Sequence, residues 1–373
     1  MKDMISNKNN LNDIRFTLSL VSAVINEKKP EEPDFEPDWG FIFQFTKSHH
    51  IDNTVFYAIE RLKNKPDTQI YKSWMEARNK CVHRTIVQHQ EFSLICSAFD
   101  KNGIEYMPVK GFAVSEMYPA DDVRFMSDLD IMVKDAAKAG TVVTELGYAA
   151  DRINYMYDDS YIKRPFMHLE LHRELFRIYS SFYNYYRDVF ERAEKHGTRY
   201  NMTREDSYIY VLAHLYKHYH ESGTGIRSVC DVYLLNKKLM PELNREYFYG
   251  ELKKLGIDIF YDEFSVLADK WFKNEDFEDF DDAEEYILDS GTYGKTKNKI
   301  VNRQNDLGKK YFYLKRIFPP LSYMKDIFYP VRKCPVLLPI FYIYRIIRLI
   351  SPKYRKKVEY ELKVINNKES VSD

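Results

Sequence analysis

Two aspartates, Asp128 and Asp130, lie one residue apart in the otherwise largely apolar segment RFMSDLDIMV. A half-buried strand normally carries Thr, Val or Tyr at such positions. Side chains alternate between the two faces of a strand, so both carboxylates point to one face. They would be about 6–7 Å apart along the strand, and would repel each other unless a cation lies between them. We therefore predict a divalent cation site, and Mg²⁺ commonly uses one or two carboxylates together with substrate phosphates.

A third acid is available in the segment FMHLELH, where alternation puts His168, Glu170 and His172 on one face. If this strand lies beside the aspartate strand, Glu170 faces the same ion. Three carboxylates on two neighbouring strands make a two-metal site for in-line phosphoryl or nucleotidyl transfer. One of them can also take the proton from the attacking hydroxyl. The histidines could be further ligands, but we favour one that orients the acid and one that is solvated.

The phosphate side of such a site is predicted in VKGFAVSEMY, where Lys110 and Gly111 lie between an expected strand and an expected helix. Backbone N–H groups at a helix start bind phosphate, glycine allows close approach and lysine adds a point charge. Arg124 and Ser127 are placed to reach the same phosphates. The alternative is a plain tight turn with an exposed lysine.

Two further pairs have a spacing of four residues on an expected helix. His214 and His218 have the spacing of a zinc site, but no third ligand is placed as that motif requires, so we interpret them as surface or core histidines. Arg227 and Asp231 suit a helical ion pair. The alternative is that Arg227 reaches the nucleotide or the acids.

Periodicity predicts the elements that position these residues. Residues 1–100 are expected to be helical, 101–178 to form a small α/β core, 179–300 to form a helical domain and 301–373 a basic, aromatic C-terminal helical segment. In 101–178 the expected order is strand, helix, strand, helix and then further strands. This predicts an α+β fold with a small mixed β-sheet core flanked by N- and C-terminal helical segments.

The segment MPVKGFAVSEMYPADDVRFMSDLDIMV, followed by HLELHREL, resembles a bacterial family of uncharacterised nucleotidyltransferases in the DNA polymerase beta-like superfamily. The family pattern has a Lys-Gly turn, a Tyr, an Arg, Asp-x-Asp and an acid beside a His. The matching positions are Lys110, Gly111, Tyr118, Arg124, Asp128, Asp130, Glu170 and His172. The resemblance extends over most of the chain and implies the fold and the reaction class. The wider superfamily has Gly-Gly or Gly-Ser at the turn, so here the phosphate cradle is expected to depend on Lys110.

Composition limits the partners and the compartment. The chain has 56 basic and 56 acidic residues among 373, so no overall field draws it to nucleic acid and DNA binding is not expected. Its four cysteines are widely spaced and form no CxxC, which is typical of reduced thiols in a cytoplasmic protein. No signal peptide is evident, and no apolar stretch reaches the length of a membrane-spanning helix.

The C-terminal segment PVLLPIFYIYRIIRLI (335–350) is strongly apolar and is followed by the basic run KYRKK. It is too short to span a bilayer. It could form an interfacial helix on anionic lipid, at the inner face of the membrane. We favour a terminal helix docked on the protein, with its arginines facing water.

The sequence thus predicts a Mg²⁺-dependent nucleotidyltransferase that transfers an NMP group from an NTP such as ATP to an acceptor hydroxyl, with release of pyrophosphate. Asp128, Asp130 and Glu170 would bind the metal, and Lys110, Gly111, Arg124, Ser127 and Arg227 would contact the nucleotide. The acceptor, whether small molecule, sugar, protein or RNA end, is not predicted. Two alternatives are a non-catalytic nucleotide-binding regulatory module and a membrane-surface accessory protein in surface-glycan or metabolite assembly.

Overall fold

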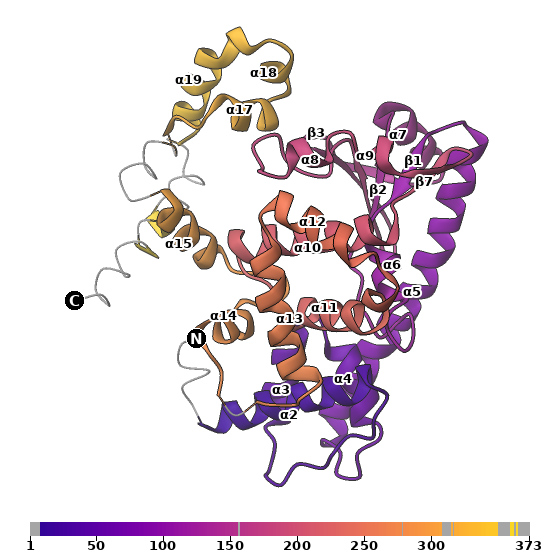
Figure 1. Cartoon of the computed structure of the whole chain (residues 1–373), viewed down its shortest axis with the longest axis vertical. Coiled ribbons are helices and arrows are strands. Elements are labelled where there is room, and N and C mark those ends of the chain that lie inside the picture. Colours follow the sequence, from indigo (N-terminus) through magenta and orange to yellow (C-terminus); the bar gives the residue numbers. More distant parts are fainter. Residues whose placement is uncertain are drawn as a thin grey trace.

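The computed structural model describes residues 8–155, 157–277, 279–307, 315, 317–349, 359–361 and 363–364. Its centre is a seven-stranded mixed sheet with the strand order β3-β4-β5-β2-β1-β7-β6 (Figure 1). The β2–β5 and β1–β7 pairs are parallel and the others are antiparallel. The strands are β1 (Tyr106–Pro108), β2 (Leu129–Val133), β3 (Ala149–Tyr155), β4 (Asp158–Lys163), β5 (Met167–His172), β6 (Glu194–His196) and β7 (Arg199–Asn201).

The pairing of β2 with β5 decides how the sheet presents its acids. Asp130 is directly beside Glu170 in the parallel register. The intervening aliphatic side chains point to the opposite face. There, Leu129, Ile131 and Leu169 belong to an apolar cluster with residues of α5 (Thr68–Lys101) and α7 (Ala136–Glu145). One face of the sheet is therefore a buried core, and the other carries the carboxylates.

The helices on the core face begin at side chains that cap them. Asp67 accepts hydrogen bonds from the first backbone N–H groups of α5, and Asp135 does the same for α7, which stabilises both starts. Helix α5 runs along the outer side of the molecule (Figure 1). The short helix after β1 is α6 (Gly111–Ser115).

A second core joins helices from both sides of the sheet segment in the sequence. It includes residues of the N-terminal helices and of the helices that follow the sheet, most of which lie below the sheet in Figure 1. The longer of these helices have buried apolar faces that repeat every three or four residues. These helices are α2 (Lys8–Ile25), α3 (Trp39–Ser48), α4 (Asp52–Ile59), α8 (Tyr183–Tyr186), α9 (Val189–Arg192), α10 (Arg204–Glu221), α11 (Ile226–Lys238), η1 (Met240–Glu242), α12 (Arg245–Leu255), α13 (Asp258–Phe272) and α14 (Asp282–Ser290).

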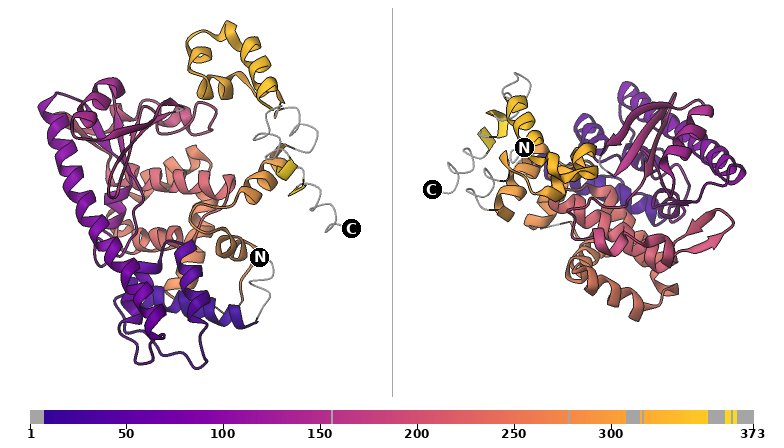
Figure 2. Two further views of the ribbon diagram at one scale, coloured as in Figure 1. Left: turned by 180° about the vertical axis from the view of Figure 1, so that it is seen from behind. Right: turned by 90° about the horizontal axis from the view of Figure 1, so that it is seen from above.

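The C-terminal elements project from this body, as the two views of Figure 2 show. They are α15 (Thr296–Leu307), α17 (Leu321–Ile327), α18 (Tyr329–Lys333), η2 (Pro335–Leu337) and α19 (Leu338–Leu349). Among the described residues, none of the helices has both the length and the apolar character needed to cross a membrane. The basic run KYRKK and Ile350 lie outside the described residues.

The predicted α+β class, with a small mixed sheet flanked by helices, is confirmed. One feature was not predicted: β6 and β7 lie beyond residue 178, where the sequence indicated helices. These three-residue strands are polar, and β7 adds to the sheet through a single register pair with β1. Three residues are too few to show the alternating pattern that indicates a strand in a sequence.

Candidate functional site

A pocket of about 330 Å³ lies between the acidic face of the sheet and helices α10 and α11. Its wall contains side chains from the turn after β1, the ends of β2 and β5, both helices and the turn after α14. The structure brings all eight predicted site residues to this one pocket: Lys110, Gly111, Arg124, Ser127, Asp128, Asp130, Glu170 and Arg227.

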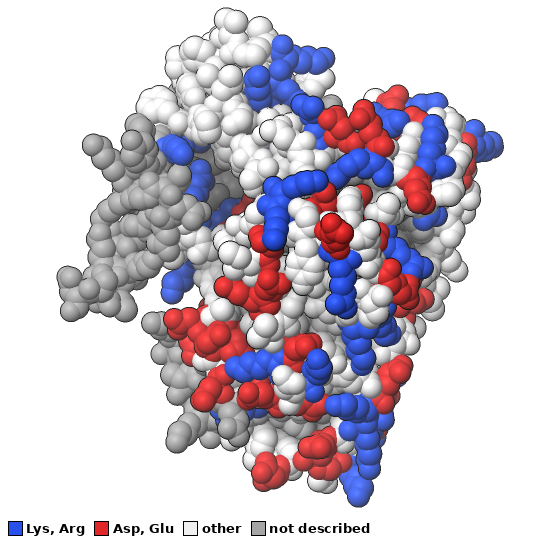
Figure 3. Space-filling model, in the orientation of Figure 1, with Lys and Arg blue, Asp and Glu red and all other residues white. Residues whose placement is uncertain are grey.

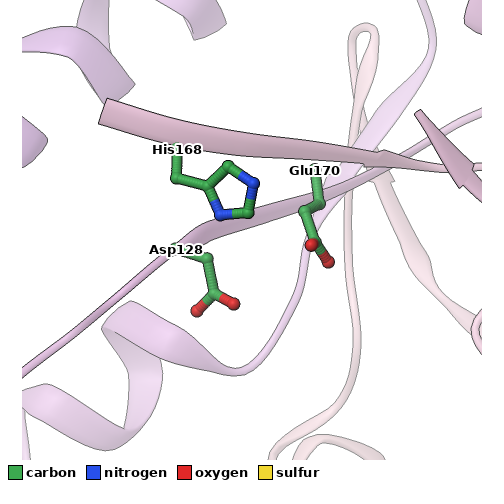
Figure 4. Close-up of side chains that lie close together, drawn as sticks. All are labelled: Asp128, His168 and Glu170. Carbon is green, nitrogen blue, oxygen red and sulfur yellow. The ribbon is translucent and has the colours of Figure 1, made fainter. Parts of the chain in front are cut away.

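Glu170 belongs to two groups of side chains that could bind a metal ion. Asp128, His168 and Glu170 have ligand atoms that all lie within 4.8 Å of one another, and the same holds for Asp130, Glu170 and His172. Figure 4 shows the first group. Asp128 lies one residue before β2, and Ser127 Oγ donates a hydrogen bond of 2.8 Å to its Oδ1. Glu170 belongs to both groups, so its carboxylate would be a ligand of a divalent metal held by either group.

Asp130 is buried between two cations. Lys110 Nζ lies 3.0 Å from Oδ2, and His172 Nε2 lies 2.9 Å from Oδ1. Burial alone would raise the pKa of Asp130, but Lys110 and His172 outweigh it and hold this pKa well below its usual range. His172 shows the converse, because Asp130 raises the pKa of its imidazole despite burial. Asp130 is therefore ionised, and His172 orients it. The prediction had a histidine orient Glu170 and the other histidine solvated, whereas His168 lies 2.9 Å from the Ser160 hydroxyl.

Glu170 has a different environment. Its burial, followed by the negative charge of Asp130, raises its pKa from 4.5 to about 7. His172 Nε2 and an Arg152 guanidinium nitrogen lie 3.7 Å and 3.9 Å from its carboxylate oxygens, too far for direct hydrogen bonds. A carboxylate that is poised near neutral pH can accept a proton from a hydroxyl.

The Lys110-Gly111 turn is the predicted phosphate cradle. Lys110 has a backbone φ of 42°, a strained conformation for a residue with a Cβ, and such strain clusters at functional sites. A Cβ on Gly111 would come within 2.7 Å of Met126 Sδ, so glycine lets the turn close on this side chain. The following helix has only five residues, which leaves the Lys110 ammonium as the main positive group of the turn.

Helix α10 contributes a wall that was not predicted. Lys110 Nζ also lies 3.1 Å from His214 Nε2, which in turn lies 3.2 Å from His218 Nε2. Burial lowers the pKa of both histidines far below 6.5, and it lowers the pKa of Lys217 to about 8. All three α10 residues line the pocket. Their spacing of three and four residues places them on one helix face, and this polar stripe is the sequence signal that could have found them.

A comparison with models of protein families shows which family the chain belongs to. The model of the family described as "Uncharacterised nucleotidyltransferase" matches residues 36–273. The chain belongs to this family. The match includes every predicted site residue and the α10 wall, and ends before α14. Family membership supports nucleotidyl transfer as the general activity, and no curated protein or solved structure gives a significant match.

This family implies a divalent metal, and the residues of this nucleotidyltransferase fit one. The three converging carboxylates supply the hard oxygen donors that Mg²⁺ prefers. The pKa of Glu170 is raised chiefly by burial and then by the negative charge of Asp130 beside it. Lys110 and His172 already neutralise Asp130. The negative charge that they leave unbalanced is that of Glu170.

Arg124, in the segment before β2, ties this nucleotidyltransferase site to Asp231 of α11. Its Nε and one terminal nitrogen donate to the two oxygens of Asp231 at 2.7 Å and 2.8 Å, and the Tyr118 hydroxyl donates to Oδ1 at 2.7 Å. The predicted ion pair between Arg227 and Asp231 is therefore wrong: Asp231 is engaged by Arg124, and Arg227 donates to the Phe125 carbonyl at 2.9 Å. Arg227 still lines the pocket, as its alternative role requires.

Proposed function

We propose that this protein transfers an NMP group from an NTP to an acceptor hydroxyl and releases pyrophosphate. Asp128, Asp130 and Glu170 would hold Mg²⁺, which supplies charge neutralisation and orientation of the phosphates when it is bound. Lys110 and Lys217 would bind the triphosphate together with Arg227. The observation that carries this proposal is the pairing of Asp130 beside Glu170 in the wall of a pocket that Lys217 and Arg227 also line.

In the proposed reaction, the acceptor oxygen forms a bond to the α-phosphorus of the NTP. The bond from that phosphorus to the oxygen that bridges the α- and β-phosphates breaks, and pyrophosphate leaves with the bonding electrons. The hydroxyl proton would pass to Glu170, the candidate general base of the site. Lys110 and Lys217 counter the charge that develops on the leaving group.

The position of the α10 wall supports a triphosphate as the ligand. Lys217 is half-buried, and burial is the main cause that lowers its pKa to about 8, partly opposed by Glu221. A partly desolvated ammonium gains when phosphate oxygens replace its lost hydration. Since Lys110 is held at 3.0 Å from Asp130, Lys217 is the lysine more available to a ligand.

The test uses a double variant, Asp128→Asn with Asp130→Asn, and an exposed control pair on α13, Asp262→Asn with Glu263→Gln. We expect both proteins to fold, and only the first to lose Mg²⁺-dependent release of pyrophosphate. Turnover that is unchanged in the first variant would refute the proposal. Tight NTP binding by the wild type without pyrophosphate release, over a broad acceptor screen, would favour a non-catalytic nucleotide-binding module.

A further inference from the structure

The C-terminal hairpin, which we define as α17 to α19 (residues 321–349), exposes an apolar helix face. On α19, Ile340, Ile343 and Ile347 are 61%, 59% and 61% exposed. Their spacing of three and four residues puts them on one face. Val336, just before α19, is 84% exposed. Large side chains gathered in this way mark a surface that meets an apolar partner.

The other side of α19 is already occupied. Phe341 packs against Phe328 with ring centroids 4.8 Å apart, and the Tyr342 hydroxyl donates to the Pro319 carbonyl. The hairpin is held to the sheet body by a ring contact between Tyr323 and Tyr179 and an ion pair between Arg332 and Glu174. Among the described residues, these contacts dock α19 by one face, and our expectation that docking would cover its apolar side is not met by Ile340, Ile343 and Ile347.

Most charged residues of the hairpin are basic. Residues 327–349 contain four Lys or Arg residues and no Asp or Glu, and Asp326 just before them is buried. In Figure 3 the hairpin is largely white, with a group of basic side chains at its edge. A segment with this number of cations beside an apolar face has the character of sites that bind anionic lipid headgroups. The hairpin also lies beyond residue 273, where the family match ends.

We propose that the C-terminal hairpin binds the surface of an anionic lipid bilayer. Helix α19 would lie in the interface, with Ile340, Ile343 and Ile347 among the acyl chains and the basic residues at the phosphates. The half-exposed ring of Tyr344 suits the same depth. A second copy of the chain is a poorer occupant, because it would bring two such basic segments together. Nucleic acid is poorer too, because isoleucines offer no stacking surface for bases.

The experiment is flotation of the full-length protein with phosphatidylcholine vesicles that contain or lack phosphatidylglycerol. The variant Ile340→Asp with Ile347→Asp removes the apolar contact. Its matched control is Ile259→Asp with Val266→Asp on α13, where the residues are also seven apart and are 68% and 71% exposed. None of these four residues lines the pocket. Pyrophosphate release should therefore be unchanged in both variants, which separates this test from that of the proposed function.

We expect the wild type and the α13 control to float with the phosphatidylglycerol vesicles, and the α19 variant to bind them at least about ten-fold more weakly. Added salt should release the protein, since each basic residue near the surface contributes about a five-fold gain in binding. Three results would overturn the proposal: no flotation, equal flotation with phosphatidylcholine alone, or equal loss in both variants. A dimer in solution that the α19 substitutions dissociate would also overturn it, because the face would then be a self-interface.

Discussion

Replacing Glu170 by Gln should stabilise the metal-free protein, and the effect should depend on pH. Folding raises the pKa of Glu170 from 4.5 to about 7, and its side chain is only 20% exposed. Since one pKa unit corresponds to about 1.4 kcal/mol, the ionised carboxylate costs the fold roughly 3 kcal/mol. The folded state binds this proton more tightly than the unfolded chain. The cost is therefore absent below about pH 4.5, grows up to about pH 7 and stays constant above it.

Urea unfolding of the wild type and Glu170→Gln in EDTA, at a series of pH values, measures this cost. Above about pH 7 the variant should be more stable by up to roughly 3 kcal/mol, and the two proteins should converge near pH 4.5. Added Mg²⁺ should reverse the order, because only the wild type gains binding energy. The exposed control Glu263→Gln should differ from the wild type by less than about 0.5 kcal/mol throughout. A Glu170→Gln difference that is the same at every pH would refute the reasoning.

Three further predictions concern the walls of the pocket. In steady-state assays of pyrophosphate release, Lys217→Met should lower kcat/KM for the NTP by about ten- to a hundred-fold, and Lys217→Arg should retain most of it; equal kinetics for Lys217→Met and wild type would contradict this. Asp231→Asn leaves the buried Arg124 guanidinium without its partner, so urea titration should show a loss of about 3–5 kcal/mol; a loss below about 1 kcal/mol would mean that the pair is not buried as described. The affinity for Mg²⁺, measured by calorimetry, should rise as the pH increases through about 7 because Glu170 must lose its proton to bind; a pH-independent affinity would contradict the assignment of Glu170.

The central geometry was predictable because it depends on local rules. Strand alternation places Asp128 and Asp130 on one face, and the same rule applied to the later strand places Glu170. The prediction also required the two strands to be neighbours in the sheet. Strands β2 and β5 are indeed paired.

The rest of the pocket depends on contacts between distant parts of the chain. Arg124 and Asp231 are 107 residues apart, so the local spacing of Asp231 with Arg227 gave the wrong partner. In the sequence, Lys217 has the pattern of a solvent-exposed helix residue. It becomes half-buried because α10 packs over the sheet. The exposed isoleucines of α19 were expected to be covered, since periodicity shows that a face is apolar but not whether anything packs against it.

The most direct test of the central claim is mass spectrometry of the products formed when the wild type and the Asp128→Asn, Asp130→Asn variant are incubated with NTPs and cell extract. We predict that an acceptor gains the mass of one nucleotidyl group with the wild type, that pyrophosphate accumulates with it, and that neither occurs with the variant. Identical products from both proteins, or NTP that binds without any acceptor gaining mass, would contradict the account.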